Sequence, residues 1–292
     1  MVGLAYAKVN LHLSVGPLRG DAFHSIVSIF QKIDLHDTIA IEVEEDSEFS
    51  IKIEGINFPN STIERAARLF SAEAKIPLKV EVKCTKKIPI QGGLGGGSSD
   101  GATTLTLLNA LTNYPLTTSQ LITLGAQIGS DIPFFLSGAA AAMVTGRGEI
   151  VEPISREGVL EGILIIPKGE GVSTPQAYGQ LDQVREEVPP LPKKEPLIEV
   201  YTKSPSKWSF TNDFRLIGGP NGTLYSHLDQ IVAEVGDCFG SLSGSGPAYA
   251  IFCDEREIVE EIRDKMGDYG GDITIIRIKS LHPDHSDVTV SV

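Results

Sequence analysis

The chain has 292 residues and a formal net charge of −13, with a sequence pI of about 4.9. This length is sufficient for two domains with cores of their own, and the acidic balance argues against nonspecific binding to nucleic acid. The overall charge would repel an anionic substrate, so a site for one must be positive locally, through lysines or backbone N–H groups.

The cysteines and the apolar segments limit the class of protein further. The three cysteines are widely spaced and odd in number, which predicts buried thiols in a reducing cytoplasm and not a disulfide framework or a zinc site. Lys8 and Asn10 interrupt the apolar start of the chain, so we expect no signal peptide. The apolar segment 133–144 is too short to span a membrane. We therefore expect a cytoplasmic protein.

The N-terminal part predicts strands. Residues 5–15 alternate in places between apolar and polar side chains, and Lys8 shares the polar side. On this pattern alone, Lys8 is a solvated strand lysine. Further strands are expected around 39–43 and 51–53, and the acidic run 42–48 is interpreted as the solvated edge of a hairpin.

The next elements lead into a glycine-rich loop. Ser61 and Glu64 form a capping-box pattern that opens a helix, and residues 78–84 alternate as a half-buried strand. Five of the six residues from Gly92 to Gly97 are glycine. No strand or helix interior tolerates that density, so the loop must have a use for bare backbone.

A helix follows the loop directly. Ala102, Leu105 and Leu108 recur at helical spacing, and Ser98 or Ser99 is the predicted N-cap. Free N–H groups and the positive end of the helix dipole then converge on one spot, which suits phosphate. A Walker loop would need Lys after its last glycine, and the dinucleotide fingerprint would need glycine at position 98, so both are excluded.

The segment after this helix ends at an aspartate. Thr117 and Gln120 cap another helix, and Gly129 stops it. Asp131 follows the stop and precedes Pro133 and two phenylalanines. From the residues alone, Asp131 is a turn aspartate that caps the next segment, or it is a functional carboxylate at the wall between a polar loop and an apolar core.

The C-terminal part predicts an α+β arrangement. The apolar run 162–166 is a buried strand, after a domain boundary within 151–160. Residues 188–196 contain four prolines and predict a stiff, exposed connector. The remaining elements are given with their expected ranges in order: capping residues at 212–213, a helix at 224–235, a second glycine loop at 241–247, a strand at 248–253, a helix at 258–266, a strand at 272–278 and a polar tail around 282–287.

Several segments resemble those of one kinase superfamily. The loop Pro89-Ile-Gln-Gly-Gly-Leu-Gly-Gly-Gly-Ser-Ser-Asp100 is similar to the ATP loop of the GHMP kinases, which include galactokinase, homoserine kinase and mevalonate kinase. With Ala7-Lys8-Val-Asn10, Phe23-His24, Gly129 to Phe135 and Thr174 to Tyr178, the chain looks most like the 4-diphosphocytidyl-2-C-methyl-D-erythritol kinases. The loop 241–247 resembles the third motif of the superfamily, which packs beside the ATP loop.

The resemblance implies a fold and a reaction. It implies a GHMP kinase fold of class α+β with an N-terminal ATP-binding domain (1–155), a C-terminal ferredoxin-like sandwich (156–292) and the active site between them. The reaction is transfer of the ATP γ-phosphate to the 2-hydroxyl of 4-diphosphocytidyl-2-C-methyl-D-erythritol, with ATP and Mg²⁺. The implied partner is this small cytidine diphosphate derivative. We expect no binding to nucleic acid or to a membrane, and we expect a monomer or a homodimer.

The resemblance also implies roles for single residues. Asp131 takes the proton of the attacking hydroxyl, and Lys8 polarises that hydroxyl and keeps Asp131 ionised. Asp100 either points away from the phosphates or reaches them through Mg²⁺. The implied ATP-binding residues are Pro89, Gly92, Gly93, Leu94, Gly95, Gly96, Gly97, Ser98 and Ser99. The implied substrate-binding residues are Asn10, Phe23, His24, Thr174 and Tyr178.

Alternatives remain open at this point. Phe23 stands where the family usually has Tyr, and Gln91 and Gly101 are further departures from the family pattern. Phe23 could serve core packing, His24 a hydrogen-bonded turn, and Tyr178 an ordinary helix surface. The competing functions are a homoserine or mevalonate kinase and a catalytically silent nucleotide-binding regulator.

Overall fold

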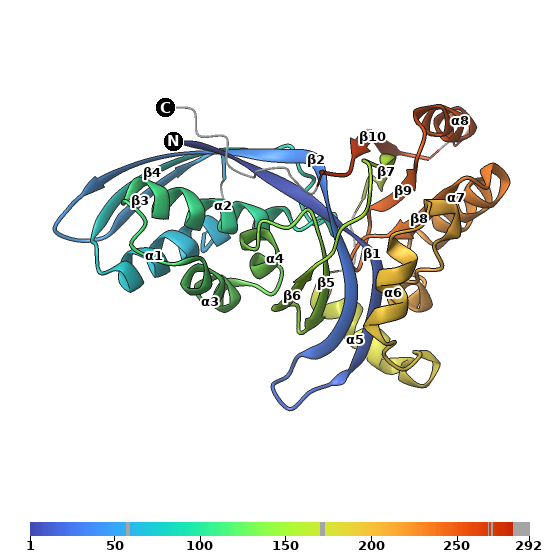
Figure 1. Ribbon diagram of the computed structural model, residues 1–292, viewed down its shortest axis with the longest axis horizontal. Coiled ribbons are helices and arrows are strands. Elements are labelled where there is room, and N and C mark those ends of the chain that lie inside the picture. The colour runs from blue at the N-terminus through green and yellow to red at the C-terminus, as the bar shows by residue number, and fades with distance from the viewer. Residues whose placement is uncertain (57–58, 170–172, 268, 270, 283–292) are drawn as a thin grey trace.

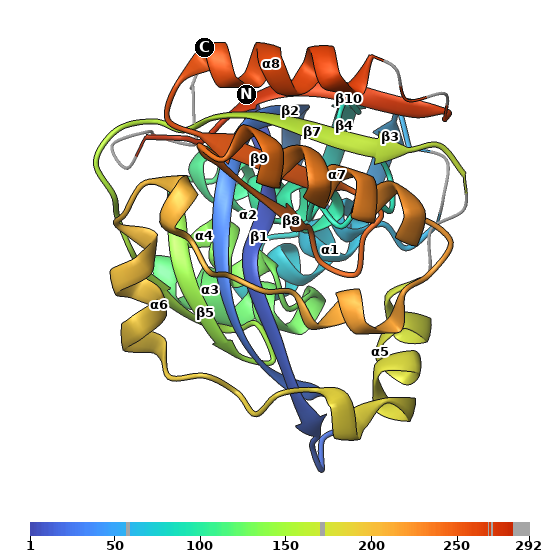
Figure 2. The same cartoon turned by 90° about the vertical axis from the view of Figure 1, so that its right-hand side faces the viewer.

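The computed structural model (Figures 1 and 2) describes residues 1–56, 59–169, 173–267, 269 and 271–282. The predicted polar tail lies beyond them, apart from its first residue. No helix within these ranges has the length and apolar character that a membrane crossing requires. All three cysteines are buried and unpaired, which confirms the expectation of buried thiols.

The first sheet has six strands in the described part of the chain. They are β1 (Val2–Leu18), β2 (His24–Glu45), β3 (Ser50–Glu54), β4 (Leu78–Thr85), β5 (Ala141–Gly146) and β6 (Ile150–Pro153). The order is β3-β4-β2-β5-β6, and β1 pairs with β2 in a long curved ribbon (Figure 1). Because β4 lies between β2 and β3, the acidic run 42–48 joins two strands that do not pair. The prediction of a hairpin there was wrong.

Helices α1 to α4 lie on one face of this sheet (Figure 1). They are α1 (Thr62–Ala74), α2 (Gly96–Leu111), α3 (Thr118–Ile128) and α4 (Ile132–Leu136). The capping box at Thr117 and the stop at Gly129 are confirmed. Ser61 caps α1, but the Glu64 side chain accepts a hydrogen bond from Asn60 N–H instead of completing the box.

The predicted N-cap of α2 was wrong. The helix begins at Gly96, and its N-cap is Gly95, in the left-handed conformation with φ +68° and no side-chain cap. Ser98 and Ser99 therefore lie inside the first turn. The chain enters the helix through a backbone conformation that favours glycine, which removes the need for a serine cap.

The second sheet is built from four strands within the described residues, in the order β10-β7-β9-β8. They are β7 (Glu161–Pro167), β8 (Cys238–Leu242), β9 (Tyr249–Cys253) and β10 (Ile273–Lys279), with α7 (Gly222–Val235) and α8 (Arg256–Met266) on the outer face (Figures 1 and 2). The chain order β7-α7-β8-β9-α8-β10 is that of a ferredoxin-like sandwich, which confirms the predicted fold class. The short edge strand β8 was missed, and its last two residues, Ser241 and Leu242, were interpreted as the start of the second glycine loop.

Between β7 and α7, the described part of the chain forms five short helical elements. They are α5 (Thr174–Gln183), η1 (Arg185–Glu187), α6 (Lys194–Tyr201), η2 (Pro205–Lys207) and η3 (Asp213–Ile217). The predicted exposed connector 188–196 was wrong at both ends, because Val188 is buried and α6 begins within it.

Strand β1 is buried on both faces, which the alternating pattern did not predict. Helices cover one face, and the C-terminal half packs against the other, where Val9 and Leu11 share a hydrophobic cluster with Leu164 and Phe239. The two halves are further joined by a β-bridge between Ile33 and Ser280. The predicted boundary at 155/156 falls between β6 and β7 and stays a prediction.

Candidate active site

A cavity of about 400 Å³ opens where the two halves meet. Its wall includes the middle of β1, the glycine loop with the first turn of α2, the residue before α4, the start of α5 and the second glycine loop. Predicted site residues from four distant segments of the sequence therefore line one space. They are Lys8, Asn10, Pro89, the run from Gly92 to Ser98, Asp131, Thr174 and Tyr178.

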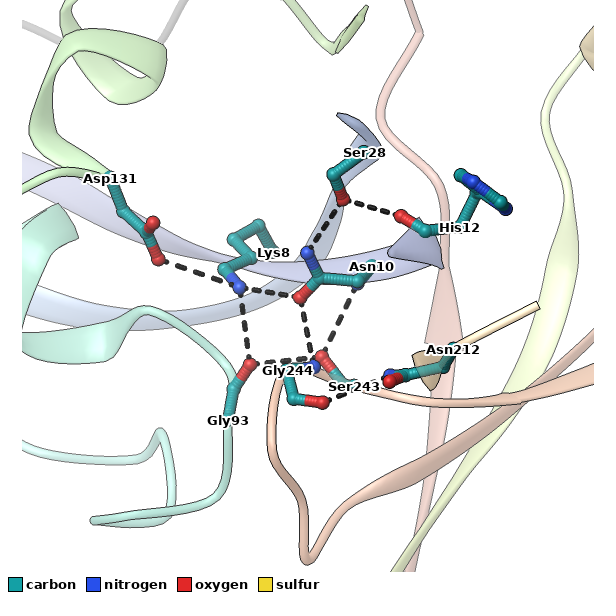
Figure 3. Close-up of polar contacts among 9 residues, drawn as sticks. All are labelled: Lys8, Asn10, His12, Ser28, Gly93, Asp131, Asn212, Ser243 and Gly244. Carbon is teal, nitrogen blue, oxygen red and sulfur yellow. Dashed lines mark hydrogen bonds and ion pairs between the residues drawn. The ribbon is translucent and has the colours of Figure 1, made fainter. Parts of the chain in front are cut away.

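Lys8 lies at the centre of this cavity wall and is only 4% exposed. Its ammonium donates to Asn10 Oδ1 at 2.7 Å and approaches the Gly93 carbonyl at 3.4 Å (Figure 3). It also lies 4.6 Å from the centre of the Phe30 ring. It forms an ion pair with Asp131 Oδ2 at 3.4 Å. The interpretation as a solvated strand lysine is therefore wrong. Lys8 is a buried cation that touches the ATP-loop backbone and a carboxylate at once.

Asn10 fixes the position of Lys8. Its side-chain Oδ1 accepts from Lys8 and, at 2.9 Å, from the backbone N–H of Gly244, while its Nδ2 donates to Ser28 Oγ at 2.9 Å (Figure 3). Every polar atom of this buried amide thus has a partner, and the second glycine loop is tied to β1.

The second glycine loop packs beside the first, as expected. Ser243 Oγ donates to the Gly93 carbonyl at 2.9 Å, and the Asn212 amide donates to the carbonyls of Leu242 and Gly244 (Figure 3). Asn212 also accepts from Phe214 N–H, which confirms its predicted capping role. Its two bonds to Leu242 and Gly244 give it a second role, since they hold the second glycine loop.

At two positions of the first loop, close neighbours leave no room for a side chain, so glycine is required there. Gly93 has φ +76°, and a Cβ there would lie 2.1 Å from the Ser243 carbonyl oxygen. A Cβ on Gly95 would lie 3.0 Å from Lys8 Cγ and 3.1 Å from Phe135 Cζ. The bare backbone lets both the second loop and the Lys8 side chain approach closely.

The first turn of α2 presents unpaired N–H groups to the cavity. The first intrahelical bond runs from Ser99 N–H to the Gly95 carbonyl at 2.9 Å, so the N–H groups of residues 96–98 precede it and have no partner within the helix. The helix dipole adds positive potential at the same place. This geometry suits an anionic phosphate chain.

Asp131 immediately precedes α4, but its side chain makes no capping hydrogen bond there. The carboxylate is 28% exposed and is directed at Lys8 instead (Figure 3). The interpretation as a capping aspartate is thereby excluded. Tyr178 borders the same space: burial, with a smaller contribution from the Asp131 charge, raises the pKa of its hydroxyl to about 12. Tyr178 is therefore a neutral hydrogen-bonding group at neutral pH.

Comparisons with known proteins bear on this arrangement. The model of the GHMP kinases N terminal domain matches residues 61–139, and that of the GHMP kinases C terminal domain matches residues 208–272. The 4-diphosphocytidyl-2-C-methyl-D-erythritol kinase of Rhodococcus jostii (strain RHA1) is 33% identical over 276 residues, covering 91% of this chain and 88% of that protein. The chain belongs to the 4-diphosphocytidyl-2-C-methyl-D-erythritol kinase family.

Solved structures agree with this family. A crystal structure of 4-(cytidine 5'-diphospho)-2C-methyl-D-erythritol kinase superimposes with a TM-score of 0.74 at 28% identity, covering 95% of this chain and 99% of that one. The mevalonate kinase of Methanococcus jannaschii reaches a TM-score of 0.66 at 16% identity, covering 97% and 98%, and shares the fold alone. As a member of this kinase family, the chain is an ATP-dependent small-molecule kinase.

Three residues predicted for the site of this kinase do not line the cavity as the described residues define it. Ser99 is buried in the first turn of α2. Phe23 is 44% exposed at the tip of the β1–β2 ribbon under the Arg147 guanidinium, so the core-packing alternative is excluded. His24 is buried behind Tyr178, with its ring stacked on the Tyr178 ring at 4.9 Å.

The sequence analysis missed a charged cluster behind the ATP loop. Lys86, on the cavity wall, bonds Asp37 Oδ2 at 2.5 Å and Asp100 Oδ2 at 2.7 Å. Asp37 Oδ1 also accepts from the N–H groups of Lys87 and Ile88 at 2.5 and 2.8 Å. A lysine next to the loop, Lys86, was the sequence feature that could have indicated this cluster. The cluster itself could not be predicted, because the two carboxylates that Lys86 bonds lie on other elements, β2 and α2.

The cluster has an excess of negative charge. Burial raises the pKa of Asp100 to about 7, because its pairing with Lys86 only partly offsets desolvation and Asp37 adds repulsion. For Lys86, desolvation lowers the pKa, but the two carboxylates outweigh it and the pKa rises. Asp100 Oδ2 accepts from Lys86, while its buried Oδ1 has no hydrogen-bond partner among the residues that the structure describes.

Proposed function

We propose that this kinase transfers the γ-phosphoryl group of ATP to the 2-hydroxyl of 4-diphosphocytidyl-2-C-methyl-D-erythritol, a step in isoprenoid precursor biosynthesis. One observation carries the proposal: the Lys8 ammonium lies 3.4 Å from both Asp131 Oδ2 and the Gly93 carbonyl, so one cation joins the carboxylate to the ATP loop. The names of the relatives supply the substrate, and residues predicted for ATP and residues predicted for the substrate line the same cavity.

The chemical step follows from this pair. The substrate hydroxyl oxygen attacks the γ-phosphorus, its proton passes to Asp131, and the bond from the γ-phosphorus to the bridging oxygen breaks as ADP leaves. Lys8 orients Asp131 through their ion pair and offsets the negative charge that develops on the transferring group. Where the transition state is loose, Asp131 contributes mainly by orienting the hydroxyl.

The loop from Pro89 to Ser99 binds the triphosphate in this scheme. The N–H groups of residues 96–98 and the Ser98 hydroxyl face the cavity and would bind phosphate oxygens. Within the described residues, no group of three or more His, Cys, Asp or Glu side chains could hold a metal. Mg²⁺, which neutralises phosphate charge when bound, would be held largely by ATP itself, with the Ser98 hydroxyl as a protein ligand.

The other end of the cavity would receive the cytidine part of the substrate. Thr174 and Tyr178 line it from α5, and Asn10 lines it from β1. Phe23 and His24, at the start of the ribbon's return strand, complete this proposed end of the site. The exposed ring of Phe23 offers a stacking face, without the hydroxyl that the usual tyrosine would add.

The same proposal extends to the setting in which the enzyme works. Three buried unpaired thiols fit a reducing cytoplasm, and the acidic balance of the chain argues against a nucleic-acid partner. We propose that the enzyme acts there as a monomer or homodimer.

ATP consumption with and without the diphosphocytidyl substrate tests the proposed function. We expect ADP release to depend on that substrate, with homoserine and mevalonate giving at most background turnover. Turnover that prefers homoserine or mevalonate would contradict the substrate. ATP binding with no phosphorylation of any of the three alcohols would indicate a silent regulator.

A further inference from the structure

Helix α5 lies beside the β1–β2 ribbon (Figure 2), and side chains of α5 and η1 contact this ribbon. The Arg185 guanidinium donates to the carbonyls of Val15 and Gly16 at 2.8 and 3.0 Å. One turn before it, Asp182 Oδ2 lies 3.4 Å from His24 Nε2. The segment that carries Thr174 and Tyr178 into the cavity is therefore anchored to the ribbon by side chains outside the cavity.

The His24 ring is held from three directions. Its Nδ1 lies 2.9 Å from the Gly16 carbonyl, which can only accept, so Nδ1 carries a hydrogen. One face stacks on Tyr178, with the planes 26° apart. The remaining nitrogen, Nε2, faces the Asp182 carboxylate and forms an ion pair with it when the ring is protonated.

Tyr178 and Asp182 are one helical turn apart on α5, so they lie on the same face of the helix and meet the same imidazole. Tyr178 turns one side of its ring to His24 and lines the cavity. Phe214 closes the Tyr178 ring from another side, edge-on at 5.0 Å. The placement of the Tyr178 ring thus depends on the His24 ring, and the protonated His24 ring is held in turn by its ion pair with Asp182.

We propose that Asp182 is a positioning residue for the cytidine end of the substrate site, acting through the His24 ring on the Tyr178 wall of the cavity. Asp182 holds the His24 ring in one orientation through Nε2, where the hydrogen bond of Nδ1 alone would let the ring rotate. The Tyr178 ring, which stacks on His24, then stays in the position that binds the base. Such pre-organisation strengthens binding without a direct contact. The inference rests on the proposed function, since it takes the cytidine end to lie against Tyr178.

The test compares Asp182→Asn with the wild-type enzyme in steady-state kinetics. We expect the KM for the diphosphocytidyl substrate to rise roughly three- to tenfold, because the ion pair is part exposed. The kcat and the KM for ATP should stay within about twofold, since Lys8, Asp131 and the glycine loop are unchanged. Asp182→Glu should restore most of the affinity, and Glu186→Gln, the same charge change at an exposed site on η1, should have no effect.

Binding of cytidine 5'-diphosphate alone, measured by calorimetry, separates this inference from the proposed function. We expect the dissociation constant to rise in Asp182→Asn by the same factor as KM. An unchanged or lower KM and dissociation constant, or an equal rise in Glu186→Gln, would overturn the role of Asp182. A wild-type enzyme that binds cytidine diphosphate without phosphorylating the substrate would contradict the function, and the two affinities would still decide the inference.

Discussion

Two lysines flank the glycine loop, and their surroundings differ. Lys8 pairs with one carboxylate, Asp131, at 3.4 Å on an open cavity wall. Lys86 bonds two carboxylates at 2.5 and 2.7 Å, and both carboxylates are almost completely buried. The first pair keeps an ionised oxygen accessible to a reactant. The second cluster ties β2, the end of β4 and the first turn of α2 together.

The difference shows how one loop can be both rigid and reactive. Both carboxylate oxygens of Asp37 accept hydrogen bonds, from Lys86 and from the N–H groups of Lys87 and Ile88, so the residues that lead into the loop are held in place. Asp131 has no capping bond of its own, so its carboxylate is left for Lys8 and a substrate. We expect substitutions in the Lys86 cluster to alter stability and those in the Lys8 pair to alter turnover.

The largest effect is expected at the open pair. Asp131→Asn removes the proton acceptor and should lower kcat roughly 100- to 10,000-fold. The dissociation constant for ATP and the melting temperature should change little, because the loop and its supports are intact. Single-turnover kinetics and ATP titration measure these quantities, with Asp264→Asn on the exposed side of α8 as the matched control. Full activity would remove Asp131 from the mechanism.

A smaller effect, on stability, is expected in the buried cluster. Asp37→Asn leaves Lys86 with one carboxylate. The amide oxygen can still accept from the two backbone N–H groups, but the amide NH2, a donor, then faces the Lys86 ammonium. The free energy of unfolding should fall by about 2–4 kcal/mol, as for a broken buried charge pair. Urea unfolding measures it, and Asp264→Asn serves again as control. A loss of turnover at unchanged stability would show that the cluster acts in catalysis instead.

The smallest effect concerns the pH dependence of stability. The folded-state pKa of Asp100 is raised to about 7, so the folded chain binds one more proton than the unfolded chain between pH 4 and 7. Stability from this group is full below pH 4 and is lost as the pH rises through 7. Asp100→Asn should remove this dependence, so the melting temperature of the wild type relative to the variant should fall between pH 5 and pH 8. The same dependence of melting temperature on pH in the wild type and in Asp100→Asn would contradict a raised pKa of the buried Asp100 carboxyl.

Local signals in the sequence predicted much of the fold. The cap at Thr117, the stop at Gly129 and the two glycine loops each depend on neighbouring residues, and the structure has them where expected. The two-faced burial of β1 could not be predicted, because the second face is covered by the distant C-terminal half. The Gly95 cap was missed because the prediction considered only the preference of N-caps for serine. It did not consider the left-handed backbone of Gly95 or the close approach of Lys8 to it.

The site was predictable only in part for the same reason. Lys8 and Asp131 could be paired from the resemblance, but nothing in the spacing of the residues places them 3.4 Å apart. Asp37, on β2, meets Lys86 only because β2 and β4 are neighbours in the sheet. The position of His24 behind Tyr178 depends on how α5 docks on the ribbon, which no local pattern reports.

A double-mutant cycle on the open pair tests the central claim most directly. The phosphorylation rate would be measured for Lys8→Met, Asp131→Asn and the double variant under single-turnover conditions. If the ammonium and the carboxylate act as one unit, the double variant should be no more than about threefold slower than the slower single variant. Losses that multiply would show that the two groups act independently and would contradict the account.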